Sequence, residues 1–231
     1  MTVDPPPEVA LLWGTRDRPR PGPKPSMSVE AIVTVAIACA DAEGLATLSM
    51  QRIADELGYT KMSLYRYVPG KAELVALMLD TALGPPPDLA DAGDGWRPKL
   101  RAWALHLWTA GNRHPWWLEA AIGPRVLGPN EMGWLESGLG ALVDTGLPYG
   151  ERLDTIVLLT SHVRGLIQQT AGAPRPEHDL RAAIASVLSE HGDRYPEVVA
   201  ALGGSGSGSS DEALEFGIDR ILDGLAAHLG T

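Results

Sequence analysis

The chain has 231 residues, of which 45% are hydrophobic, enough to build a substantial core in one or two domains. Its formal net charge of −10 argues against unspecific binding to nucleic acids, and its single cysteine excludes an intrachain disulfide and a cysteine-based metal site. No apolar run reaches the length of about 18 residues that crosses a bilayer, and no signal pattern opens the chain, so we expect a cytoplasmic protein without a membrane partner.

The charge is distributed unevenly along the chain. Residues 14–78 hold eight Lys and Arg against seven Asp and Glu, whereas residues 79–231 hold eleven against twenty. A neutral-to-basic front on an acidic remainder fits a protein that binds DNA with its front only. The first 27 residues are rich in Pro, Gly and Arg, and we expect them to be a disordered arm. This arm is either a plain linker or a minor-groove contact through Arg16, Arg18, Arg20 and Lys24.

Two short helices joined by a tight turn at Gly58 are predicted after this arm and a first helix. The first of the pair follows a capping Ser49 and buries a face with i, i+3, i+4, i+7 spacing: Met50, Ile53, Ala54 and Leu57. The second follows a capping Thr60, turns Leu64 and Val68 inward and leaves polar side chains outside. A short helix of this kind fits into a DNA major groove.

Apolar stripes predict further helices on both sides of this pair. They cover residues 29–43, 71–84, 96–111, 115–123, 132–143, 149–170, 177–191, 195–202 and 214–229. A loop is expected over residues 85–95, after three consecutive prolines. The Gly/Ser run over residues 203–210 is a flexible spacer, and both a native loop and an engineered scar remain open for it. Since no repeat and no strand pattern occurs, the fold class is all-α.

The helix-turn-helix segment, residues 53–68 followed by Lys71-Ala-Glu-Leu74, resembles the tetracycline-repressor (TetR) family of transcriptional regulators. Residues 215–224 are similar to the branch that contains the tetracycline repressor itself. The resemblance implies an N-terminal three-helix head that binds DNA, residues 28–80, and a C-terminal body that binds a ligand and dimerises, residues 81–231. The chain departs from the family pattern at Val68 and at Pro69-Gly70, where Phe and a Lys-Ser or Lys-Asn pair are common.

The resemblance also implies which side chains meet DNA. Four fall where family members meet base edges: Gln51, Lys61, Met62 and Ser63. Three fall where phosphates are held: Tyr65, Tyr67 and Lys71. Arg66 suits either role. A solvated surface position is the alternative for each of them, and for Tyr65 a place in the core is a further alternative.

A homodimer on a palindromic operator is expected, because one head of this size covers too little DNA to be specific. Two recognition helices would lie about 34–36 Å apart on such a palindrome. The predicted helix over residues 149–171 is apolar around much of its circumference, as if covered on two sides. We expect it to form a four-helix interface with the helix over residues 212–229 and their counterparts in a second chain. A fully buried helix within one chain is the alternative.

Seven tryptophans, five of them between residues 96 and 117, predict a pocket for a planar or hydrophobic small-molecule effector. The candidate ligand contacts are Trp103, His106, Trp134, Arg164 and Gln168, with Asn112 and His162 as further polar groups. The alternative is that the tryptophans are core residues. A ligand would act by binding one spacing of the two heads more tightly than another, through the helix that begins at Lys71.

No constellation of catalytic side chains occurs in the sequence. It contains no His-Glu-x-x-His metal motif and no nucleophile elbow, and His106 and His114 are too far apart to suit a metal triad on their own. We therefore expect no enzyme, no metal site and no cofactor, but a ligand-responsive transcriptional regulator, by resemblance a repressor. An interaction module that kept the fold but lost DNA binding is the alternative, and the set of Lys61, Tyr67 and Lys71 argues against it.

Overall fold

The computed structural model describes residues 7–14, 27–123, 125–170, 176–204 and 210–230. Within these residues the regular structure is helical and no strand occurs, which confirms the all-α fold. None of the helices in this part of the chain is long and apolar enough to span a membrane. The α-helices are α1 (Pro7–Leu12), α2 (Val29–Glu43), α3 (Met50–Leu57), α4 (Lys61–Leu64), α5 (Lys71–Leu83), α6 (Trp96–Asn112), α7 (Trp117–Ala120), α8 (Pro129–Gly140), α9 (Tyr149–Thr170), α10 (Pro176–His191), α11 (Pro196–Gly204) and α12 (Ser210–Leu229). Four short 3₁₀ helices occur between them: η1 (Leu45–Thr47), η2 (Ala90–Ala92), η3 (Val143–Thr145) and η4 (Gly192–Arg194).

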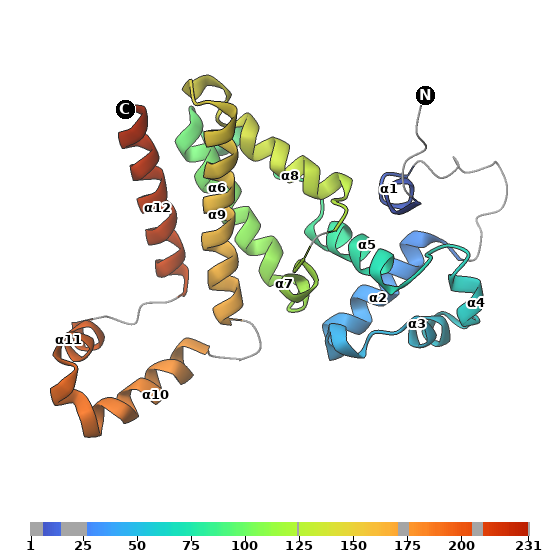
Figure 1. The fold of residues 1–231 in the computed structure, drawn as a ribbon, viewed down its shortest axis with the longest axis horizontal. Helices are drawn as coiled ribbons and strands as arrows, with labels where there is room; N and C mark the ends of the chain where they lie inside the picture. Colours follow the sequence, from blue (N-terminus) through green and yellow to red (C-terminus); the bar gives the residue numbers. More distant parts are fainter. Residues whose placement is uncertain (1–6, 15–26, 124, 171–175, 205–209, 231) are drawn as a thin grey trace.

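Helices α2, α3 and α4 form the head, at one end of the molecule (Figure 1). α2 begins where the sequence predicts, because the Ser28 hydroxyl accepts a hydrogen bond from the backbone N–H of Ala31. One face of each helix is buried, with Ile32, Ile53 and Leu64 completely shielded from solvent. The head is therefore held together by side chains at the predicted apolar positions.

The head is joined to the rest of the chain by α5, which lies between the two parts in Figure 1. α5 contacts α2 on the side of the head and contacts α7 and α8 on the side of the body. Its apolar side chains are buried along almost the whole helix, among them Leu74, Met78 and Leu79. A helix buried against both parts is suited to transmit a displacement from one to the other.

The body is built on α6 and α9, with α8 and α12 packed against them (Figure 1). α6 buries the stripe of Leu100, Trp103 and Leu107, and α9 completes this core with apolar side chains one turn apart: Ile156, Leu159, Val163 and Ile167. Both stripes have the helical spacing expected for a helix with one buried face.

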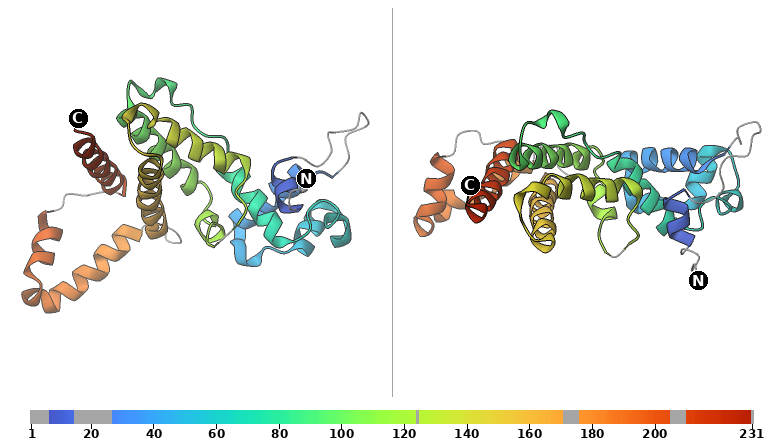
Figure 2. Two further views of the ribbon diagram at one scale, coloured as in Figure 1. Left: turned by 45° about the horizontal axis from the view of Figure 1, so that its top comes forward. Right: turned by 90° about the horizontal axis from the view of Figure 1, so that it is seen from above.

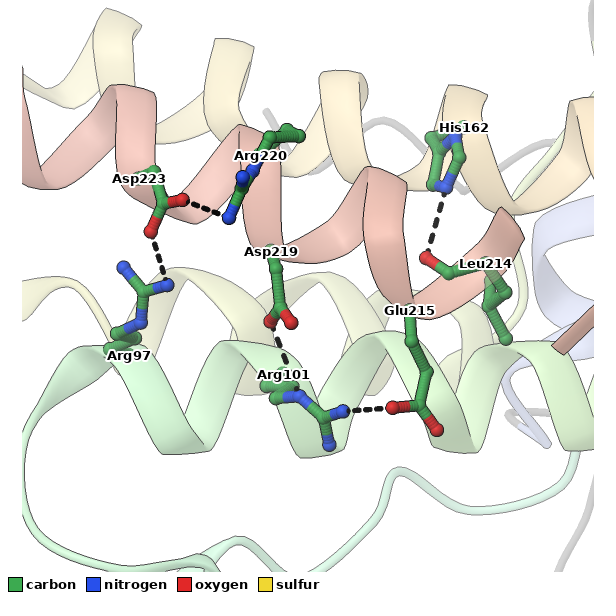
Figure 3. Close-up of polar contacts among 8 residues, drawn as sticks. All are labelled: Arg97, Arg101, His162, Leu214, Glu215, Asp219, Arg220 and Asp223. Atoms are coloured by element: carbon green, nitrogen blue, oxygen red, sulfur yellow. Dashed lines mark hydrogen bonds and ion pairs between the residues drawn. The ribbon is translucent and has the colours of Figure 1, made fainter. Parts of the chain in front are cut away.

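Charge pairs align α12 with α6, as Figure 3 shows. Arg97 of α6 lies 2.5 Å from the carboxylate of Asp223, and Arg101 lies 2.6 Å from that of Glu215. These pairs are partly exposed to solvent, where ion pairs contribute little to stability. Most of the stabilisation of α12 comes from its buried apolar face, formed by Leu214, Ile218 and Leu222.

Helices α10 and α11 extend away from α6, α8 and α9 in all views (Figures 1 and 2). Several large apolar side chains of this pair and of the connection between them are exposed: Val187, Tyr195, Val198 and Val199. The pair therefore adds little to the core of the body.

The N-terminal segment differs from the expected disordered arm. Residues 7–14 include α1, whose Leu11 and Leu12 are buried and which contacts α5. The indole N–H of Trp13 donates to the carbonyl of Leu127 at 3.2 Å. A short apolar cluster thus overrides the Pro-rich composition around it. Residues 1–6 and 15–26, with Arg16, Arg18, Arg20 and Lys24, lie outside the described residues, as do residues 205–209 of the Gly/Ser run.

The helix bounds predicted for residues 29–43 and 149–170 are confirmed, since α2 and α9 have the same ends. The helix expected over residues 115–123 is shorter, because α7 spans only Trp117–Ala120. Its four residues are flanked by a turn on either side.

Candidate DNA interface and ligand cleft

The turn between α3 and α4 has the geometry of a helix-turn-helix. α3 ends at Gly58, whose φ of 72° and ψ of 28° lie in the left-handed region that favours glycine. The hydroxyl of Ser49 accepts from the N–H of Arg52 at 3.2 Å, and that of Thr60 accepts from the N–H of Ser63 at 3.3 Å. Both predicted helix caps are therefore formed.

α4 is shorter than the predicted recognition helix, and a turn carries the chain from Leu64 to Val68. The N–H of Val68 still bonds to the carbonyl of Leu64 at 2.9 Å, and both side chains are fully buried. The exposed side chains of this segment are Lys61, Met62, Tyr65 and Arg66. Met62 is 73% exposed, so it has little part in the packing of the head.

Tyr65 lies at the surface and not in the core, which was the alternative prediction for this residue. Tyr65 is 36% exposed, and the ammonium nitrogen of Lys61 lies 5.7 Å from the centre of its ring. A cation at this distance from an aromatic face is attracted to it. This contact orders the lysine near the surface that would face DNA.

Gln51 and Ser63, two further candidates for base contacts, have local hydrogen-bond partners. The Gln51 amide is exposed on α3 and donates to the Asp55 carboxylate at 2.7 Å. The Ser63 hydroxyl is half-buried and lies 2.9 Å from the hydroxyl of Thr60. Gln51 is thus the more accessible of the two.

Tyr67 and Lys71, the remaining candidates for phosphate contacts, lie beside the core of the head. Tyr67 is half-buried and packs against it. Lys71 is exposed at the start of α5, and its ammonium group donates to the carbonyl of Leu45 at 3.4 Å. This bond leaves two of the three ammonium hydrogens for other acceptors.

A polar joint connects the end of α5 with the start of α8, and we call it the α5–α8 joint. Asp80 is buried. Its carboxylate accepts from the N–H of Glu131 at 3.0 Å, and its backbone carbonyl accepts from the side-chain amide of Asn130 at 2.9 Å. The indole of Trp134 donates to the carbonyl of Gly84 at 3.0 Å. Burial raises the pKa of Asp80. These bonds link the end of α5 to α8.

An open cleft of about 980 Å³ lies where α2, α7, α8 and α9 meet. One wall comes from the head, namely Ala40, Asp41 and Gly44 at the end of α2. The α9 wall comprises Leu153, Ile156, Val157, Thr160, Ser161, Arg164, Gly165 and Gln168. The remaining side is formed by Pro115, Trp116, Leu118, Glu119, Ile122 and Leu135. Its size and its uncovered apolar side chains suit a hydrophobic small molecule.

Asp41 links the head to the body at the edge of this cleft. Its Oδ1 accepts from the indole N–H of Trp116 at 2.7 Å and lies 2.8 Å from Nδ1 of His114. Asp41 belongs to α2, whereas the two rings belong to the segment between α6 and α7. A molecule in the cleft would therefore touch a contact that fixes the head relative to the body.

Two of the five predicted ligand contacts, Arg164 and Gln168, line the cleft. Trp103 and Trp134 lie in the core, with ring centres 5.9 Å apart in an edge-to-face arrangement. The indole of Trp103 donates to the carbonyl of Trp134 at 2.9 Å. His106 is exposed on α6 and is not among the lining residues. The packing of Trp103 and Trp134 therefore supports the alternative prediction that these tryptophans are core residues.

The further polar candidates Asn112 and His162 also lie outside the lining of the cleft. The Asn112 amide donates to the carbonyl of Trp108 at 2.9 Å, and a ring nitrogen of His162 lies 3.2 Å from the carbonyl of Leu214 (Figure 3). Trp116, which is not among the predicted ligand contacts, borders the cleft, although its side chain is almost completely buried. The available signal was the helical spacing of residues 153, 157, 160, 164 and 168, which places them on one face of α9.

A second depression, of about 530 Å³, runs between α9 and α12, and we call it the α9–α12 groove. It is lined by Leu147, Glu151, Asp154, Thr155, Leu158, Arg220, Ile221, Gly224, Leu225 and His228. Leu158 is 53% exposed here and is the apolar residue that α9 contributes, beside Glu151, Asp154 and Thr155.

A helix-turn-helix head coupled through one helix to an all-helical body with a cleft at their junction defines the class of ligand-binding transcriptional regulators. Family models match both parts: "Bacterial regulatory proteins, tetR family" over residues 32–78 and "Tetracyclin repressor-like, C-terminal domain" over residues 87–229. The chain therefore belongs to the TetR family of transcriptional regulators, which are transcription factors and not enzymes.

Individual relatives agree with this assignment. The chain is 41% identical to the HTH-type transcriptional repressor DrrR1 of Streptomyces coeruleorubidus, over 93% of this chain and 83% of the relative. It is 26% identical to an HTH-type transcriptional regulator of Saccharopolyspora erythraea, over 82% and 80% of the two chains. The crystal structure of the TetR family protein ActR of Streptomyces coelicolor in complex with actinorhodin has a TM-score of 0.77, with 28% identity over 89% of this chain and 99% of ActR. The predicted family is thus confirmed.

Proposed function

We propose that this chain is a ligand-responsive repressor that binds a palindromic operator as a homodimer and is released by a small hydrophobic or aromatic effector. The observation that carries the proposal is the shared wall of the cleft, to which α2 of the head and α9 of the body both contribute. A ligand that fills this space acts on the head directly. It alters operator affinity by the difference between its affinities for the two head positions.

The DNA contacts follow from the exposure of the head residues. Lys61 and Met62 are exposed at the start of α4, where side chains can reach base edges, and Gln51 reaches the same groove from α3. Tyr65 and Lys71 hold phosphates, and Arg66 serves either type of contact. The half-buried side chains Ser63 and Tyr67 add contacts through their hydroxyl groups.

The homodimer is supported by the α9–α12 groove. Among its apolar side chains, Leu158 is 53% exposed, and Ile221 and Leu225 are only partly buried. A second copy would cover them with its own α9 and α12 in a four-helix interface. The two-fold symmetry of such a dimer requires a palindromic operator.

The effector site is supported by the chemistry of the cleft and by a structural relative. Ile122, Leu153 and Val157 offer exposed apolar surface, and Gln168 offers a hydrogen-bonding amide. ActR, which has a similar fold, has been crystallised with actinorhodin. Together these observations favour an aromatic or hydrophobic effector.

Selection of bound sequences from random DNA tests the DNA-binding part of the proposal. We expect the purified protein to enrich a palindrome and a gel shift with that sequence to weaken steeply as salt is raised. Met62→Ala should change the preferred base at one position of each half-site, because the residue makes few contacts in the folded head. Lys99→Ala on α6 is the control and should leave selection unchanged. Enrichment of no palindrome would refute the proposal.

A further inference from the structure

The wall that α9 presents to the cleft changes in chemical character along the helix. Its first half is apolar, with Leu153 and Val157, and its second half is polar, with Thr160, Arg164 and Gln168. At a rise of about 1.5 Å per residue, the distance from residue 153 to residue 168 is about 22 Å. The cleft therefore suits an elongated molecule with one apolar and one polar end.

The polar half contains the positive charge of Arg164, which makes no hydrogen bond or ion pair within the described residues. Arg164 is half-buried, and no acceptor of the described chain lies within hydrogen-bond distance of its guanidinium group. The neighbouring cation, Arg125, is different, since Glu131 engages it through both carboxylate oxygens. Burial and the charge of Arg125 lower the pKa of Arg164, and the carboxylate of Glu131 offsets part of this effect. An anion placed next to Arg164 would replace the hydration that burial has removed.

The acidic side chains of the cleft are less suited to bind a cationic ligand. Asp41 already accepts from Trp116 and faces the ring nitrogen of His114. Glu119 lies at the open side of the cleft, where it is exposed to solvent and its attraction for a cation is screened. Arg164 is thus better placed to bind an anion than the acidic side chains are to bind a cation.

We propose that the effector is an amphipathic aromatic acid, whose carboxylate pairs with Arg164 and whose rings lie on the exposed apolar side chains of the cleft, Ile122, Leu153 and Val157. This inference rests on the proposed function, since it specifies the ligand of the same cleft. The planar guanidinium group can hold a carboxylate through two parallel hydrogen bonds, and Gln168 one turn further along α9 can donate to a second oxygen. The contact also brings the acid close to the Arg125–Glu131 pair at the start of α8, and thus to the α5–α8 joint.

Three synthetic probes of one shape test the charge preference: anthraquinone-2-carboxylate, its methyl ester and 2-(aminomethyl)anthraquinone. Binding is measured by quenching of tryptophan fluorescence, since Trp116 lines the cleft. We expect the wild-type protein to bind the acid at least tenfold more tightly than the ester or the amine. Arg164→Gln should remove this preference and leave the affinity for the ester unchanged, and Arg164→Lys should retain part of it.

The matched control is Arg194→Gln, which removes an arginine of η4 that lies outside the cleft, and it should bind all three probes like the wild type. The inference is overturned if the acid has no advantage over the ester, if its advantage survives in Arg164→Gln, or if none of the probes binds. A gel shift with the selected operator separates the two proposals. If the three probes bind equally and operator binding is intact, only the proposal of an acidic effector is contradicted. If the protein does not bind the operator, the proposed function is contradicted.

Discussion

Replacement of Gly128 by alanine adds only one methyl group but should disturb the α5–α8 joint strongly. A Cβ added to Gly128 would lie 2.7 Å from the Cβ of Asp80 and would overlap its carboxyl group. The backbone of Gly128, at φ −82° and ψ 175°, is accessible to any residue, so the effect of Gly128→Ala is steric only. Because Asp80 is buried, its side chain cannot avoid the new methyl group by turning into solvent.

The expected cost follows from two effects. Overpacking of a well-packed site costs about 1–3 kcal/mol. Displacement of the Asp80 carboxylate also removes the acceptor for the N–H of Glu131 in the first turn of α8, a loss of about 1 kcal/mol for a helix cap. A combined cost of about 2–4 kcal/mol would lower the melting temperature of a chain of this size by about 4–16 °C.

Scanning calorimetry at one fixed protein concentration measures this effect. The control is Gly140→Ala, the same substitution at the end of the same helix, where no atom lies within 4 Å of the added methyl group. That variant should be as stable as the wild type or more stable by up to about 1 kcal/mol. In an Asp80→Ala background, Gly128→Ala should cost at least about 1 kcal/mol less than in the wild type. An unchanged melting temperature of Gly128→Ala, or additivity in the double variant, would show that the added methyl group does not displace Asp80.

Three further predictions concern the dimer, the joint and the head. Leu158→Glu should make the protein monomeric in sedimentation velocity at micromolar concentration. Val187→Glu, at an equally exposed site on α10, should leave it dimeric. If both variants are dimeric, or both are monomeric, the α9–α12 groove is not the dimer interface. Because burial raises the pKa of Asp80, the folded state binds its proton more tightly than the unfolded state, and the carboxylate becomes more destabilising as pH rises from about 4 through the raised pKa. Asp80→Asn should therefore gain stability relative to wild type between pH 4 and pH 7 in urea titrations, and a constant difference would disprove this. Ser49→Ala should cost about 1 kcal/mol in the same titrations, because α3 loses its cap, and no change would show that water replaces the hydroxyl.

Local sequence signals were sufficient for the helices of the head. Each cap and turn of the head depends only on residues within four positions in the sequence. The structure forms all four of them: the caps at Ser28, Ser49 and Thr60 and the left-handed turn at Gly58. The long helix α9 was predictable for the same reason, since its apolar positions recur with helical spacing over its whole length.

The ligand cleft could not be predicted in the same way, because its walls come from segments far apart in the chain. Composition marked the tryptophans as a group, but tertiary packing buries Trp103, Trp116 and Trp134 alike, and only Trp116 of these three borders the cleft. Asp80 shows the same limit. A carboxylate within a helical stripe is expected at the surface, and only the N–H of Glu131, 51 positions further along the chain, explains why it is buried.

The wall that α2 contributes to the cleft has a consequence for the operator itself. If an occupant of the cleft lowers the affinity for DNA by some factor, then thermodynamic reciprocity requires that operator DNA lowers the affinity for the occupant by the same factor. A repressor bound to its target would be a poorer receptor than an unbound one. The concentration at which a cell responds would then depend on how many copies of the protein are off the genome, and not on the cleft alone.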